Sequence, residues 1–134
     1  MKNIFTLLLI FISILSCTKK KEQLIHNNNI VDSISKYISL SHNDNIDDKE
    51  KLKALDKASQ LILVSKNSIK TRDYTYDLIT QYYTLSNWNK YKQLSKTLLK
   101  NSLISNDTLN LAKSYRSLGN FYFNNQVLDS AFYF

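Results

Sequence analysis

Glycine, proline and cysteine are nearly missing from this chain of 134 residues, which contains one glycine, no proline and one cysteine. Tight hairpins, β-sandwiches and phosphate-cradling loops depend on glycine and proline, so the composition disfavours all three. A lone cysteine supports neither a disulfide framework nor a cysteine-based metal site. Because 43% of the residues are hydrophobic and 12% aromatic, the chain can still form a core, and we expect one small all-α domain.

Charge and polar residues give no sign of catalysis. The formal net charge is +7, but apart from the run Lys19–Lys21 the charges interleave along the expected helices, which is typical of a solvated surface and not of a nucleic-acid site. His26 and His42 have no cysteine beside them, and the pair Asp47 and Asp48 is better interpreted as a helix start than as acid/base machinery. We therefore expect no enzyme activity, no metal, no cofactor and no nucleic-acid partner.

The amino terminus has the features of an export signal. Lys2 precedes a largely apolar stretch, Ile4 to Leu15, which is followed by the small residue Ser16. About twelve residues suit the core of a signal peptide and fall well short of the roughly twenty that a membrane-spanning helix needs. The sequence predicts a signal peptide at residues 1–16.

The residues Ile14, Leu15, Ser16 and Cys17 resemble the lipobox of bacterial lipoproteins. The resemblance implies cleavage before Cys17 and acylation, for example with palmitate, of its sulfur and amino group. The product would be anchored to a lipid bilayer of the bacterial cell envelope, and the lysine-rich spacer favours the side that faces the periplasm. Residues 17–29 would form a flexible lipidated linker. An ordinary signal peptide with a chance cysteine is the alternative.

A repeated pattern runs through the rest of the chain. Its strongest copy lies near the carboxyl end, and a weaker copy occurs about forty residues earlier. A third, eroded copy places Ile38 opposite Leu78 and Leu118. The two clearer copies consist of Tyr115, Leu118, Gly119, Tyr122 and Ala131, and of Thr75, Leu78, Ile79 and Tyr82, the latter followed by Trp88, Tyr91 and Leu98.

The strongest copy resembles a tetratricopeptide repeat, with an aromatic residue, Leu-Gly, tyrosine and alanine in the order of that family. The resemblance implies antiparallel helix pairs stacked as a short solenoid over residues 30–134. A period of forty instead of 34 residues, and the missing proline, leave a HEAT-like helix pair as an alternative. We expect helices at Ile30–Leu40, Asp47–Val64, Thr71–Leu85, Trp88–Ile104 and Thr108–Asn124, and a further helix that starts at Asp129.

Helix boundaries are predicted from capping residues. Asp47, Asp107 and Asp129 stand before or in expected first turns, where a carboxylate accepts hydrogen bonds from free backbone N–H groups. Asparagines such as Asn87 and Asn106 are expected in the turns, since they replace glycine there.

In the tetratricopeptide family the first helix of each pair lines a concave face. Lys113, Arg116 and Asn120 could hydrogen-bond a carboxylate or a peptide backbone there, while Tyr76 and Tyr83 could supply apolar contact area. An ordinary hydrated surface without a ligand is the alternative. Carried over to this chain, the face consists of Asp73, Tyr76, Thr80, Tyr83, Lys113, Arg116, Asn120 and Phe123.

The leading hypothesis is therefore a membrane-tethered scaffold that binds an unidentified protein or peptide. The sequence stops at Ala131–Phe134, one turn into an expected helix, and this suggests truncation. The alternative hypothesis is thus a sensory fragment of a histidine kinase or transcriptional regulator, resembling the exported amino-terminal region of tetratricopeptide signalling proteins of the Bacteroidetes. An enzymatic or nutrient-binding lipoprotein is a third and weaker hypothesis.

Overall fold

The computed structural model describes residues 29–134, and all regular structure in this part of the chain is helical. Residues 29–41 form a helix that precedes the others. It is followed by α2 (Asp48–Val64), α3 (Ile69–Thr84), α4 (Trp88–Ser105), α5 (Thr108–Asn124) and α6 (Leu128–Tyr133). The predicted signal peptide, Cys17 and nearly all of the predicted linker lie outside the described residues.

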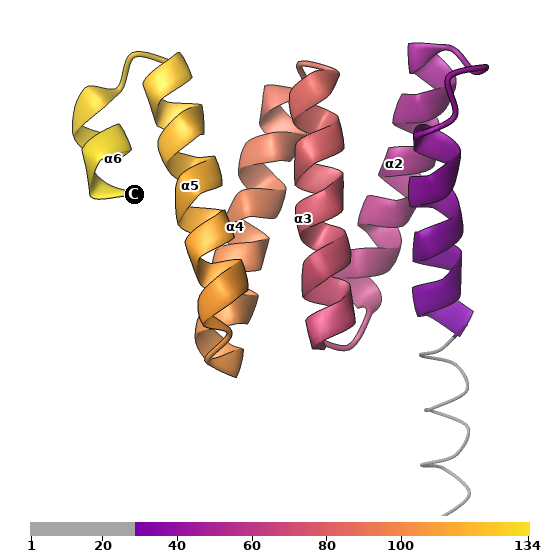
Figure 1. Cartoon of the computed structure of the whole chain (residues 1–134), viewed down its shortest axis with the longest axis horizontal. Coiled ribbons are helices and arrows are strands. Elements are labelled where there is room, and N and C mark those ends of the chain that lie inside the picture. The colour runs from indigo at the N-terminus through magenta and orange to yellow at the C-terminus, as the bar shows by residue number, and fades with distance from the viewer. Residues whose placement is uncertain (1–28) are drawn as a thin grey trace, which may run out of the picture.

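The helices stand side by side as antiparallel neighbours (Figure 1). The helix of residues 29–41, α3 and α5 form one layer, and α2 and α4 lie behind them (Figure 1). This arrangement confirms the predicted all-α, helical-repeat-like fold. The helix boundaries also agree closely with those predicted, the largest difference being that α3 begins at Ile69 and not at Thr71. Within residues 29–134 no helix combines the length and the apolar character needed to cross a bilayer.

Repeat-related positions supply the core. Ile38, Leu78 and Leu118, which follow each other at the predicted spacing of forty, are 5%, 0% and 0% exposed. Each lies on a helix of the front layer and packs inward, because apolar residues three or four positions apart share one helix face. The main buried cluster consists of Ile34, Ile38, Leu55, Ala58, Ile62, Leu78, Ile79, Tyr82, Tyr91, Leu94 and Leu98.

Polar side chains cap the helices as predicted at two of three aspartates. Asp47 Oδ1 accepts a hydrogen bond from the N–H of Glu50 at 2.7 Å, and Asp107 Oδ1 accepts one from the N–H of Asn110 at 3.1 Å. Asp129 lies in the first turn of α6, also as predicted, but the N-cap of that helix is Val127, and no side chain caps it. These caps hold each helix start in register with its turn.

The only glycine of the chain lies where α5 meets α6. A methyl group added to Gly119 would sit 3.6 Å from the carbonyl oxygen of Ala131 and 3.6 Å from the carbonyl carbon of Phe134, which are ordinary van der Waals distances. The glycine thus occupies a helix contact, as its place in the repeat suggests, but the contact has room for alanine.

Candidate functional site: a groove between α3 and α5

The layer that contains α3 and α5 presents an open groove, backed by α4. Its volume is about 300 Å³. The lining consists of Tyr76, Ile79, Thr80, Tyr83, Thr84, Tyr91, Arg116, Ser117 and Asn120. Five of the eight residues predicted for the concave face are therefore brought together here, namely Tyr76, Thr80, Tyr83, Arg116 and Asn120.

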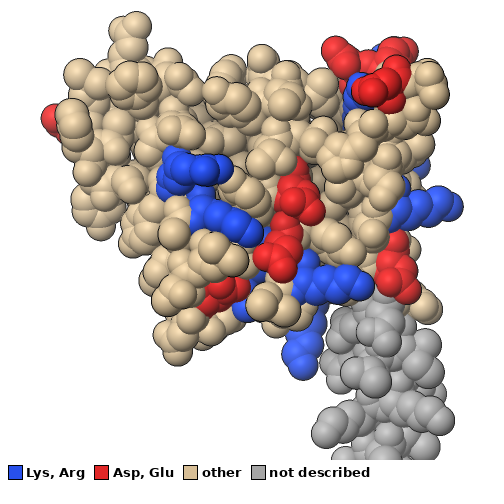
Figure 2. Space-filling model, in the orientation of Figure 1, with Lys and Arg blue, Asp and Glu red and all other residues tan. Residues whose placement is uncertain are grey.

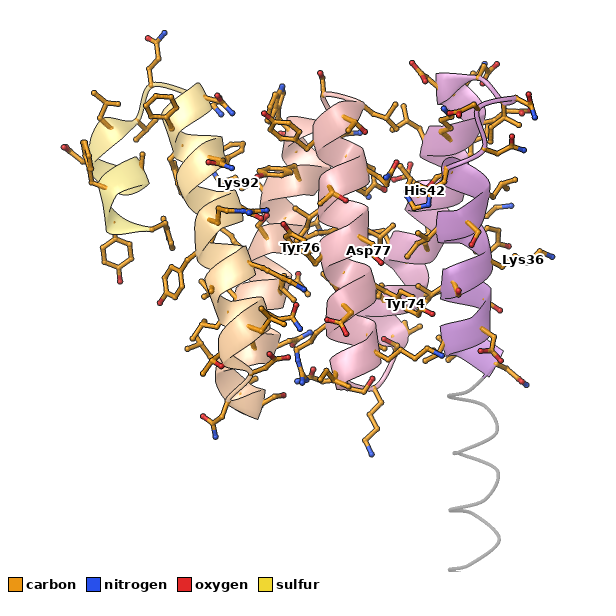
Figure 3. The ribbon with its side chains drawn as sticks, viewed as in Figure 1. Lys36, His42, Tyr74, Tyr76, Asp77 and Lys92 are labelled. Carbon is orange, nitrogen blue, oxygen red and sulfur yellow. The ribbon has the colours of Figure 1, made fainter. Side chains whose placement is uncertain are left out.

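Tyr76 is the residue around which the two helices meet. It lies on the side of α3 that faces α5 (Figure 3), and its hydroxyl accepts a hydrogen bond from Arg116 Nη2. Lys113 Nζ lies 4.8 Å from the centre of the Tyr76 ring. Two cations of α5 therefore contact this tyrosine, Lys113 at the ring and Arg116 at the hydroxyl. Arg116 is exposed and its guanidinium carries five N–H donors, which leaves donors available for a ligand.

Asp73 and Lys113 were predicted to contact a ligand, but neither lines the groove. Lys113 Nζ lies 3.8 Å from Asp73 Oδ1, and the same oxygen accepts a hydrogen bond from Asn110 Nδ2 at 3.0 Å. Both side chains therefore join α3 to α5 beside the groove. Basic and acidic groups meet across the middle of this face in Figure 2.

Tyr83 and Tyr91 line one end of the groove, and Trp88 packs against both from outside it. The Tyr83 ring centre lies 5.4 Å from that of Trp88 and 5.6 Å from that of Tyr91. Tyr91 is 3% exposed, and burial raises the pKa of its hydroxyl, opposed by the polar side chains of Ser117 and Asn120. From the sequence pattern, Tyr91 was expected only to pack between helices. It reaches the groove because α3 and α5 are far enough apart to leave it uncovered, and the sequence does not give that distance.

Phe123, the last of the eight predicted residues, belongs to a second groove of about 290 Å³ between α5 and α6. Arg116 and Asn120 line both grooves and separate them. The wall on the α6 side is apolar and includes Leu128, Ala131 and Phe132.

A buried ion pair sets the position of α5 relative to α3. Arg72 Nε donates to Asp107 Oδ2 at 2.7 Å, and the two side chains are 8% and 10% exposed. Arg72 Nη1 also donates to Asn67 Oδ1 at 2.8 Å and to Ser105 Oγ at 2.9 Å. Hydrogen bonds from Asn110 and from Arg72 lower the pKa of Asp107 to about 2. The sequence indicated Asp107 as a cap, but not that it would pair with a residue 35 positions away.

Asp77 lies on the side of α3 that faces residues 29–41 (Figure 3). Burial and the neighbouring Asp73 raise the pKa of Asp77, while His42 and Lys113 lower it. His42 Nε2 lies 2.7 Å from Gln81 Nε2, and Figure 3 shows His42 directed toward α3. Over the described part of the chain no three His, Cys, Asp or Glu side chains are close enough to hold a metal ion.

Comparison of the chain with protein-family models, curated proteins and solved structures finds no match in any of the three. What the groove can bind must therefore be inferred from its own chemistry. Its lining combines three tyrosines and an isoleucine with hydroxyl, amide and guanidinium groups. It contains no carboxylate or imidazole beside its hydroxyls that could act as a general base.

Proposed function

We propose that this protein is a membrane-tethered scaffold that binds an extended segment of a partner protein in the α3–α5 groove and catalyses no reaction. The observation that carries the proposal is the groove itself, which gathers apolar rings and free hydrogen-bonding groups from two helices. The tether rests on the sequence around Cys17 and on the apolar stretch before it.

The shape and the lining of the groove favour a peptide. A volume of about 300 Å³ lies at the lower limit of small-molecule pockets, and the groove is open along its length. One side chain of a peptide could pack between Tyr76 and Tyr83, because tyrosine supplies large contact area at small entropic cost. Asn120 and Thr80 could then hydrogen-bond the peptide backbone, and Arg116 could bind a carboxylate.

Trp88 provides a direct assay, since it is the only tryptophan of the chain and its ring contacts Tyr83. Peptides produced by digestion of envelope proteins of the source bacterium would be titrated into the protein while the tryptophan emission is recorded. We expect a saturable change in emission, and a loss of affinity of at least about tenfold in Tyr83→Ala and Asn120→Ala, as for central anchor residues of interfaces.

Tyr133→Ala and Asn89→Ala are the matched controls. Both residues are exposed outside the groove, so their affinities should stay at the wild-type value. Equal losses in groove and control variants, or no saturable signal with any peptide, would refute peptide binding in this groove.

The tether is tested separately. We expect the mature chain in the membrane fraction to carry acyl groups on Cys17, detectable by mass spectrometry, and Cys17→Ser to move the mature protein to the soluble fraction. Thr18→Ala, one residue later, should leave both properties unchanged. An unmodified Cys17, or identical fractionation of both variants, would contradict lipidation.

A further inference from the structure

One end of the helix array carries a concentration of exposed aliphatic side chains. The turn from α2 to α3 and the turn from α4 to α5 lie at this end, and the helix of residues 29–41 starts there (Figure 1). The exposed fractions range from 52% to 71%. This aliphatic end consists of Leu63, Val64, Ile69, Leu103, Ile104 and Leu109.

Each of these residues lies in the first or last turn of its helix, beyond the reach of the core. Single exposed aliphatic residues are common, but six around two adjacent turns form a patch of the kind that marks an interaction surface. The patch lies on projecting turns, and the grooves described above are lined by other residues.

Lysines surround the patch. Lys66 lies in the α2–α3 turn, Lys70 in the first turn of α3 and Lys100 near the end of α4, and all three are exposed. Of the carboxylates on the same helix ends, Asp107 is paired with Arg72, Asp73 lies 3.8 Å from Lys113 Nζ, and Asp32 is exposed. Figure 2 shows basic side chains projecting at this end.

This composition fits a lipid surface better than a protein. The anchors of protein interfaces are mostly tryptophan, tyrosine and arginine, and none of the six residues of the patch is aromatic. Aliphatic residues flanked by lysines are typical of segments that rest on anionic bilayers. At the opposite end, the α5–α6 turn exposes Val127 and Leu128 but contains no lysine, and the lysines at the start of α2, Lys49 and Lys51, alternate with Asp48 and Glu50.

The chain also enters the array at this end. Residue 29 follows Cys17 by twelve positions, and a chain of that length spans at most about 40 Å. A tether at Cys17 therefore keeps the array within about 40 Å of the bilayer and joins it at the end where the helix of residues 29–41 starts (Figure 1).

We infer that the aliphatic end rests on an anionic membrane surface, with Val64, Ile69 and Ile104 in the interfacial layer and the three lysines at lipid phosphates. The inference rests on the proposed function for the tether. The helices then stand along the membrane normal. Tyr83, fourteen residues after Ile69 on α3, lies roughly 20 Å from the bilayer, so the groove stays accessible from the side.

A fluorescent probe at the turn tests the contact. In the lipidated chain the Cys17 sulfur is blocked, so Ile104→Cys offers a single thiol for an environment-sensitive dye. The full chain would be reconstituted on vesicles of phosphatidylglycerol and phosphatidylcholine. Leu40→Cys, at an exposed leucine of the opposite end, is the matched control. We expect a blue shift and stronger emission at position 104 only.

Substitution of the lysines supplies the second readout. Each of Lys66→Ala, Lys70→Ala and Lys100→Ala should lower the equilibrium for contact by about fivefold, and vesicles of phosphatidylcholine alone should abolish most of the shift. The substituted side chains are exposed, so folding should be unaffected.

Three results would overturn the inference. An emission at position 104 typical of water, measured on protein that is tethered to the vesicle, would refute the membrane contact without refuting the tether. Equal shifts at positions 104 and 40, or a concentration-dependent shift without vesicles, would indicate unspecific insertion or pairing of two copies. If Cys17 proves unmodified, the proposed tether fails by itself, and the same dye measurement in Cys17→Ser then decides the inference.

Discussion

Asp107→Asn should destabilise the protein near neutral pH and have little effect in acid. Asparagine is as good an N-cap as aspartate, so the hydrogen bond from the N–H of Asn110 to position 107 can persist. What is lost is the negative charge 2.7 Å from Arg72 Nε, and with it the oxygen Oδ2, which accepts hydrogen bonds from Arg72 Nε and from Asn110 Nδ2. An amide NH2 at that position cannot accept them, so a guanidinium that is 8% exposed is left without its counter-charge.

Two lines of reasoning give the magnitude. Removal of one member of a buried ion pair typically costs about 3–5 kcal/mol. Arg72 keeps its hydrogen bonds to Asn67 and Ser105, which reduces that figure. Lowering the pKa of Asp107 from 3.8 to about 2 corresponds to roughly 2 kcal/mol. We therefore expect the free energy of unfolding to fall by about 2 kcal/mol.

The pH dependence follows from the direction of the shift. Because the pKa of Asp107 is lower in the folded than in the unfolded state, its contribution is complete above the unfolded value of 3.8 and is lost as the pH falls through about 2. The difference in stability between wild type and Asp107→Asn should therefore close over that interval.

Urea denaturation followed by circular dichroism, at about pH 7 and at successive values down to about pH 2, measures this difference. Asp129→Asn, which changes an exposed aspartate on α6, is the control and should stay within about 0.5 kcal/mol of wild type. Equal stability of Asp107→Asn and wild type at neutral pH would refute the reasoning, as would a difference that persists unchanged in acid.

Three further substitutions test the packing by the same denaturation assay. Gly119→Ala should stabilise the protein by about 1 kcal/mol, because a methyl fits and alanine is the better helix former; destabilisation would mean that α6 packs more closely on α5. Tyr82→Phe should cost about 1 kcal/mol, since it removes the 2.7 Å hydrogen bond to Asp56, and an unchanged stability would show that water replaces that bond fully. Leu78→Ala should cost about 2–5 kcal/mol at a fully buried site, against about 0.5 kcal/mol or less for the exposed Leu109→Ala; similar costs would contradict the assigned core.

Local interactions explain why the helices could be predicted well. The caps at Asp47 and Asp107 bond backbone groups three residues away, and Asn106 ends α4 with the left-handed φ of 51° that asparagine tolerates. The start of α3 was missed by two residues because Ser68 and Thr71 cap it mutually, a pattern without the usual acidic third residue.

The candidate site was predictable only in part. Tyr76 and Tyr83, seven residues apart, share a face of α3, and Arg116 and Asn120, four residues apart, share a face of α5. Their place along each helix could therefore be expected from spacing alone. Lys113 lies three residues before Arg116 and shares its side of α5, but its amine contacts Asp73 and not the groove. That contact depends on how closely α3 approaches α5. Sequence periodicity identifies which face of a helix is buried, but it does not give the distance between two helices.

By itself, the sequence determined the helical class, most of the helix ends and the helix faces that bury Ile38, Leu78 and Leu118, because these depend on neighbours within a few residues. Only the tertiary structure decided that Arg72 pairs with Asp107, that Tyr91 lies beneath an open groove, and that Val64 and Ile104 are exposed at the same end of the array. Each of these relations joins residues on different helices, and the separation and rotation of packed helices are set by all the side chains between them at once.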